Sequence, residues 1–169
     1  MSDERCSSFE EGLAEFYRGE VLGEIGYSAL LELAEDPLER LKLAHLLQLE
    51  TETKAWLRPH MIGAGLSIAE PASWRELAQR MIDGFAPLDW TQKMSALAAF
   101  IPDVAKQYGA YAEAARDRAD AAQAAVCDFM VDHELAQLEF FKLELDGAEP
   151  MTSLKPLMRQ SRYPLPVSN

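Results

Sequence analysis

The sequence has few cysteines and no long apolar run. Its two cysteines, Cys6 and Cys127, lie far apart and outside any CxxC pattern, so two free thiols in a cytosolic protein are the simplest account. No apolar run approaches the length of a membrane span, and residues 1–11 lack the apolar segment of a signal peptide. We therefore expect a cytoplasmic protein with no membrane contact.

Basic residues are also scarce relative to acidic ones. The chain has 16 Lys and Arg against 28 Asp and Glu, which gives a formal net charge of −12 and a pI of about 4.6. Such a surface repels phosphate groups, so we expect neither nucleic acid nor an anionic membrane as a partner. The same charge could attract cations, but a solvated acidic surface is the simpler explanation.

Two common catalytic motifs are missing. The segment Gly63-Ala-Gly65 is too short for a phosphate-binding loop and lacks its lysine, so a nucleotide site of that kind is excluded. No serine stands in a strand-to-helix elbow, although spacing alone leaves a Ser–His–Asp arrangement open.

What is abundant favours helix. Hydrophobic residues make up 49% of the 169 residues and charged residues 26%, the composition of one ordinary globular domain. Ala, Leu, Glu and Met are frequent and strand formers are sparse, so we predict an all-α protein.

Helix-breaking residues divide the chain into four long helical segments, at about 8–35, 37–62, 89–115 and 120–146. A short helix at 73–83 is predicted between the second and third, with Ser73 as N-cap and Glu76 completing a capping box. Pro102 predicts a kink in the third long helix. Residues 114–120 contain neither Gly nor Pro, so a turn and one continuous helix both stay open there.

This order predicts an up-down four-helix bundle with a crossover that carries the short helix. Residues 1–147 would form the bundle. Residues 148–169 contain four prolines and are predicted to be an extended tail that packs on it.

Acidic residues interrupt the apolar stripe of the first helix. At 100° per residue, Glu20 and Glu24 fall in the middle of a stripe made by Leu13, Phe16, Tyr17, Tyr27 and Leu31. Two carboxylates one turn apart on a core face are costly unless they are paired or bind a cation.

The other helices add further inward polar residues. His133, Glu134 and Gln137 lie on or beside the apolar stripe of the fourth helix. On the second helix, Glu50 and Glu52 flank the stripe on opposite sides, so either could enter the core. The third helix offers no inward acid, because its Asp103 lies opposite the stripe.

Three segments resemble the ferritin-like (di-iron carboxylate) four-helix-bundle superfamily. The segment from His133 to Gly147 is similar to the last helix of that superfamily. In the superfamily this helix carries a Glu-x-x-His ligand pair, followed by an aromatic residue and a Glu-Leu-x-Gly ending. Leu49-Glu-Thr-Glu-Thr-Lys54 resembles its other Glu-x-x-His helix, and Tyr17-Arg-Gly-Glu-Val-Leu-Gly-Glu24 the helix with a single glutamate. The resemblance implies a metal site, of iron or another divalent ion, with ligands from Glu20, Glu24, Glu50, His133 and Glu134.

The chain departs from that pattern at several ligand positions. Thr53 and Gln137 stand where the two histidines should be, and the third helix has no glutamate. Neither Thr nor Gln supplies the imidazole nitrogen that holds iron in such sites. His133 adjoins Glu134, so it is either a substitute ligand or a hydrogen-bonded core histidine.

Three functions follow from these residues. The first is a divergent ferritin-like bundle that has lost the standard di-iron site and acts as a binding or structural module, forming a homodimer through a helix face. The second is a ferritin-like metalloprotein with an altered site, either a metal-dependent oxidoreductase or a metal-holding protein. The third is acid–base catalysis by His133 with Glu20 or Glu24. In each, the interior pocket includes four more polar residues, Tyr17, Tyr27, Thr53 and Gln137.

Overall fold

The computed structural model describes residues 8–118 and 120–158, and within these ranges all regular structure is helical. The helices are α1 (Phe9–Leu33), α2 (Pro37–Gly63), α3 (Ala72–Phe85), α4 (Trp90–Asp117), α5 (Ala121–Leu145) and α6 (Met151–Leu154). None of them, over the residues described, is long and apolar enough to cross a bilayer. The predicted all-α class is confirmed.

The long helices begin where local capping chemistry directs. Ser8 and Glu11 form a reciprocal capping box at the start of α1, with both hydrogen bonds at 3.0 Å. Asp36, Asp89 and Asp120 cap α2, α4 and α5 with their side chains. The cap at Asp120 also shows that α4 and α5 are separate helices and not one continuous helix.

The predicted start of the short helix is wrong. The α3 helix begins at Ala72, with Pro71 as N-cap and no side-chain capping bond, so Ser73 and Glu76 form no capping box. The reason is that proline is compatible with a helix N-terminus, where its missing N–H costs nothing. Ser73 is thereby drawn inside the first turn.

The expectation of a wholly extended tail is also wrong, at Met151–Leu154. These residues form the short helix α6 directly after Pro150, and Leu154 is fully buried among residues of the core. The rest of the predicted tail, from residue 159 onward, lies outside the described residues.

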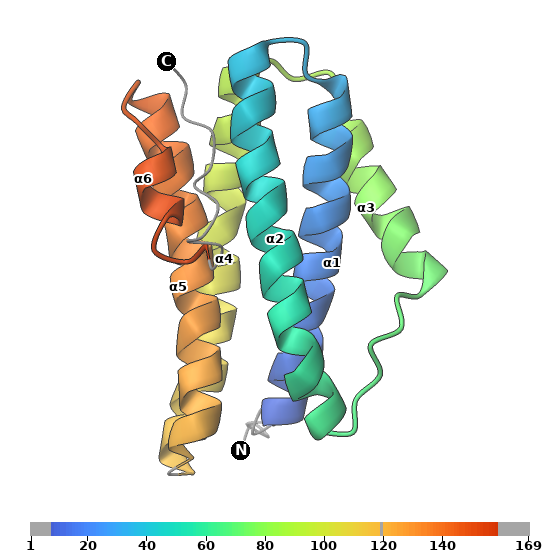
Figure 1. Cartoon of the computed structure of the whole chain (residues 1–169), viewed down its shortest axis with the longest axis vertical. Coiled ribbons are helices and arrows are strands. Elements are labelled where there is room, and N and C mark those ends of the chain that lie inside the picture. Colours follow the sequence, from blue (N-terminus) through green and yellow to red (C-terminus); the bar gives the residue numbers. More distant parts are fainter. Residues whose placement is uncertain (1–7, 119, 159–169) are drawn as a thin grey trace, which may run out of the picture.

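The helices associate as two antiparallel hairpins with one helix on the flank (Figure 1). The α1 and α2 helices pack along each other, and so do α4 and α5. The α3 helix lies against the outer side of α1, and α6 packs on α5 near the end of the molecule. The polar stripes of α1, α2 and α5 therefore face a shared interior.

The apolar core has two parts, one toward each end of the hairpins. The first contains Leu13, Phe16, Leu57 and Met130 among others, and the second contains Tyr27, Leu43, Met94 and Phe140 among others. Along α1, α2 and α5, the change from one cluster to the other falls at the inward acids and His133. Buried polar residues thus form a separate layer between two apolar ones.

Candidate metal centre in the core

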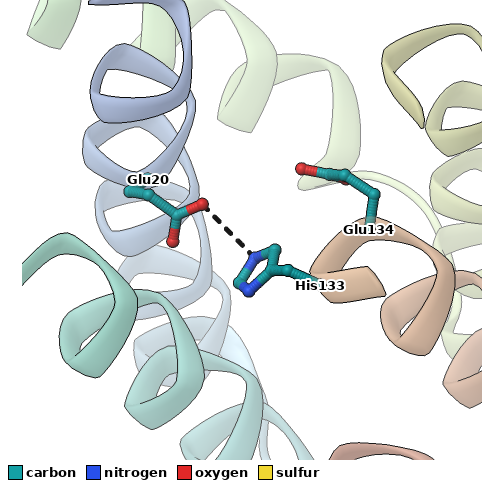
Figure 2. Close-up of side chains that lie close together, drawn as sticks. All are labelled: Glu20, His133 and Glu134. Atoms are coloured by element: carbon teal, nitrogen blue, oxygen red, sulfur yellow. Dashed lines mark ion pairs between the residues drawn. The ribbon is translucent and has the colours of Figure 1, made fainter. Parts of the chain in front are cut away.

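Four ionisable side chains from three helices meet in the polar layer. Glu20 comes from α1, Glu50 from α2, and His133 and Glu134 from α5; each is at most 6% exposed. The Nε2 atom of His133 lies 3.4 Å from Glu20 Oε1 and 3.3 Å from Glu50 Oε1. Figure 2 shows Glu20 facing His133 across the interior, with Glu134 directed into the same space.

The arrangement has the composition of a metal site. Glu20, His133 and Glu134 each offer one ligand atom, and these atoms all lie within 4.8 Å of one another. A transition-metal ion sits ~2.0–2.2 Å from carboxylate or imidazole ligands, so modest side-chain shifts would bring these atoms into its coordination sphere. Glu50 approaches the same imidazole nitrogen and supplies a further carboxylate.

Two glycines of α1 make room for this layer. A Cβ atom at Gly23 would overlap the carboxylate of Glu50, and one at Gly19 would lie 2.6 Å from the Tyr108 hydroxyl oxygen. Only a residue without a side chain lets these two groups come so near α1. The spacing of these glycines was the sequence signal for a close approach, and neither Tyr108 nor the glycines were predicted to take part.

Hydrogen bonds fix the orientation of the His133 ring. Its Nδ1 lies 3.3 Å from Thr53 Oγ1, and its Nε2 lies 2.8 Å from the Gln137 side-chain nitrogen. Gln137 Oε1 in turn accepts a 2.6 Å hydrogen bond from the Tyr27 hydroxyl. When the ring is neutral, a proton on Nδ1, donated to Thr53, lets Nε2 accept the hydrogen bond from the Gln137 amide.

The three buried carboxylates have no lysine or arginine partner among the residues described. Their one basic neighbour in an ion pair is His133. Glu20 Oε2 is also the only buried side-chain oxygen or nitrogen in that part of the chain with no hydrogen-bond partner. Buried charges of one sign are costly unless a cation compensates them.

This crowding of negative charge shifts the pKa values of the acids. Burial, reinforced by Glu50 and Glu134, raises the pKa of Glu20 well above its ordinary value. Burial raises the pKa of Glu134 to about 7, although His133 acts in the opposite direction. The layer therefore favours an added positive charge, whether a proton or a metal ion.

His133 responds in the complementary direction. Burial alone lowers its pKa, but the Glu50 carboxylate beside it, together with Glu134, outweighs burial and raises the pKa. The field of the carboxylates is thus directed at the imidazole Nε2, the atom that would bind a metal.

Two tyrosines border the layer as neutral hydroxyls. Burial and the nearby acids raise the pKa values of Tyr27 and Tyr108 well above the ordinary value. Both therefore stay protonated and can donate hydrogen bonds.

Other predicted site residues lie apart from this centre. Glu24 pairs with Lys54 and accepts a 2.8 Å hydrogen bond from Thr51. The Tyr17 hydroxyl donates to the backbone carbonyl of Ile68, at 3.1 Å. Asp103 is exposed, as its position opposite the stripe predicted, and Glu50 rather than Glu52 is the buried acid of α2.

No protein-family model matches the chain, and no curated protein or solved structure matches it. The resemblance to ferritin-like proteins therefore rests on the residues quoted above and on the buried group of Glu20, His133 and Glu134. What the molecule does must be inferred from the geometry of this centre.

Proposed function

We propose that the chain is a ferritin-like helical bundle that binds a divalent transition-metal ion in its core. Glu20, Glu50, His133 and Glu134 are the ligands in this proposal. It corresponds to the ferritin-like metalloprotein with an altered site, because Glu50 and Glu134 stand at the family's glutamate positions while His133 replaces the missing histidines.

The observation that carries the proposal is the charge imbalance of the polar layer. Three carboxylates are buried around one imidazole, and Glu20 Oε2 has no partner among the described residues. A divalent ion would supply the missing positive charge and engage that oxygen. Thr53 supports the same conclusion, since a histidine ligand needs its other ring nitrogen held by a hydrogen-bonding partner.

The donor set indicates which ions fit. Imidazole nitrogen suits Fe, Zn, Cu and Ni, whereas carboxylate oxygen suits Mn and the harder ions. One nitrogen among several carboxylate oxygens therefore favours Fe²⁺ or Mn²⁺ over the thiolate-seeking metals. Either ion, when bound, would supply Lewis-acid or one-electron chemistry to a molecule beside it.

Elemental analysis tests the proposal directly. The protein is purified without chelator, loaded separately with Fe²⁺ under anaerobic conditions, Mn²⁺ and Zn²⁺, and then freed of loosely bound ions. We expect about one ion per chain or more, and loss of that ion in Glu20→Gln and Glu134→Gln.

Glu24→Gln is the matched control. Glu24 lies one turn after Glu20 on the same helix but is paired with Lys54, so its substitution should leave the metal content unchanged. A chain that takes up none of the three ions would overturn the proposal, as would equal loss of metal in Glu24→Gln.

A purely structural role is the second candidate, and one observation favours it. Tyr27, Gln137, His133 and Thr53 form a continuous hydrogen-bonded series across three helices, which specifies packing without a metal. In that case Glu20→Gln would leave every property except stability unchanged. The predicted homodimer belongs to this candidate, and light scattering at two protein concentrations tests it.

A further inference from the structure

A cavity lies between α1, α3 and α4, beside the apolar core clusters, and Tyr27, Ile101 and Tyr108 of those clusters form part of its lining. Its volume is about 610 Å³, within the range of ~300–1,000 Å³ usual for small-molecule sites. The cavity forms because α3 packs along α1 but not closely against α4. Part of the apolar face of α3 is therefore turned toward α4 across a gap. Met81 on α3 and Phe100 on α4 line it and are 38% and 54% exposed, which places its mouth between these two helices.

The walls of the cavity are almost entirely apolar. On the α3 side they include Leu77, Met81 and Phe85, and on the α4 side Leu97, Phe100 and Ile101. The α3 residues recur at intervals of four, which puts them on one face of the helix. A ligand that fills this space would therefore gain most of its affinity from burial of its own apolar surface.

The inner end of the cavity meets the polar layer. Glu50, Glu134 and Gln137 line it there, together with the hydroxyl-bearing Tyr27 and Tyr108, whereas Glu20 and His133 do not. A metal bound by the four ligands would thus have Glu20 and His133 behind it and the cavity beside Glu50 and Glu134. The cavity would then lead from solvent to the two ligands Glu50 and Glu134.

The charge of this inner end selects the class of ligand. The three carboxylates of the polar layer, two of which line this end, would exceed the charge of a divalent ion, so an anionic group would stay disfavoured there even with metal bound. A cationic group would not be required, because the proposed metal would supply positive charge. The one basic residue lining the cavity, Arg18, forms a 3.2 Å ion pair with Glu15 and does not offer an unpaired charge.

We propose that the α1/α3/α4 cavity binds an uncharged, mainly apolar small molecule with its hydroxyl or carbonyl group at the Glu50–Glu134–Gln137 end. Gln137 and the tyrosine hydroxyls can hydrogen-bond such a group. The choice of an uncharged over a cationic group, and its placement beside a metal, rest on the proposed function, but the binding of the apolar part does not. The two parts can therefore be tested apart.

Gly26 provides a way to fill the cavity without disturbing its walls. It lies on α1 and lines the cavity, and a Cβ atom there would meet nothing within 4 Å. Gly26→Leu should occupy the space and also improve helix propensity. Gly109→Leu is the matched control, because Gly109 is also helical and equally open but does not line the cavity.

The first experiment uses metal-free protein and the neutral dye N-phenyl-naphthylamine, whose fluorescence rises in apolar surroundings. We expect saturable binding that decanol reverses, and at least about tenfold weaker competition by decanoate of the same chain length. Gly26→Leu should weaken dye binding at least about tenfold, the scale of steric exclusion from an apolar pocket, and Gly109→Leu should not.

Leu77→Trp should fill the cavity from its α3 wall, and it keeps the test decisive if Gly26→Leu fails to fold. Unchanged dye affinity in both filled variants would overturn the proposal, and so would equal competition by decanol and decanoate. Because no metal is present, this result does not depend on the proposed function.

The second experiment joins the cavity to the metal. Protein loaded with Co²⁺ is titrated with decanol while the visible absorption of the ion is recorded; the spectrum should change in the wild type and not in Gly26→Leu. A protein that binds dye but no Co²⁺ contradicts the metal site and leaves the cavity ligand supported. Dye binding with an unaltered Co²⁺ spectrum overturns the placement of the polar group.

Discussion

Glu20 and Glu24 stand one turn apart on α1, and the fold treats them in opposite ways. The Glu24 carboxylate is a quarter exposed and is held by Lys54 and Thr51. Glu20 is fully enclosed, and its nearest ionisable groups are His133 and two further carboxylates. Glu24 has the partners of a structural ion pair, whereas Glu20 lacks a compensating charge among the residues described.

The difference shows why burial of an acid is not by itself a sign of function. Lys54 is as buried as the inner acids, but it bonds to both Glu24 and Glu70, and the three form a closed unit. Glu144 is likewise satisfied, by Lys42 and by the indole of Trp90. Only the layer around Glu20 calls for a group that the described residues do not provide.

The largest expected effect is stabilisation of the inner layer by metal. At a free Mn²⁺ concentration of about 100 times the dissociation constant, the free energy of unfolding should rise by about 2.7 kcal/mol. Urea denaturation with and without Mn²⁺ measures it. Glu50→Gln should lose this stabilisation by Mn²⁺, and Glu24→Gln should keep it. If both variants kept it, the inner layer would not differ from the Glu24–Lys54 pair in metal binding.

The next largest effect is expected from two substitutions that should change the free energy of unfolding of the metal-free protein in opposite directions. Glu20→Met should raise the free energy of unfolding by about 1–3 kcal/mol, since it removes a buried oxygen without a partner. Lys54→Met should lower it by about 1–2 kcal/mol, less than the ~3–5 kcal/mol of a fully buried pair, because Glu24 and Glu70 are each 25% exposed.

Chemical denaturation in the presence of EDTA gives both values. If Glu20→Met destabilised the protein as Lys54→Met does, Glu20 would already be satisfied without metal, and the contrast between the two acids would disappear.

A smaller effect is expected at Gly23, which touches the inner layer without being a ligand. In Gly23→Ala the new methyl group displaces the Glu50 carboxylate, so metal affinity should fall about tenfold, as for other residues that position ligands. The metal-free protein should be as stable as wild type or up to ~1 kcal/mol more stable, because Ala favours helix.

Gly26→Ala is the control for this change, because its methyl group meets no atom within 4 Å. Metal titration followed by calorimetry compares the two variants. Equal affinities would show that Glu50 does not depend on the space at Gly23.

The helices could be predicted closely because their ends are set by local chemistry. Ser8, Asp36, Asp89 and Asp120 cap their helices through bonds to residues two or three positions on, and Gly147 ends its helix region with a φ of 71°. The errors came at α3, where Ser73 was predicted as the N-cap although Pro71 holds that position, and at α6, where the prolines of the tail were taken as breaks although a helix begins directly after Pro150.

The inner residues were partly predictable. The stripe pattern predicted that Glu20, His133, Glu134 and Gln137 point inward, because helical period alone decides which face is apolar. It could not separate Glu20 from Glu24, since the choice depends on where Lys54 of another helix reaches. Tyr108 and the cavity depend on the placement of α3, which no local pattern determines.

The smallest expected effect concerns the outer pair and its dependence on pH. Partial burial raises the pKa of Glu24, but the hydrogen bonds from Lys54 and Thr51 outweigh burial and lower it below the ordinary value of 4.5. Glu24 therefore stabilises the folded state above that pH, and the contribution is lost as pH falls through the lowered pKa. Because the carboxylate is partly exposed, it should amount to less than about 1 kcal/mol. The difference in unfolding free energy between wild type and Glu24→Gln, measured from pH 7 to pH 3, should shrink toward zero at the acid end, whereas a difference that grows there would mean that Glu24 is not held by Lys54.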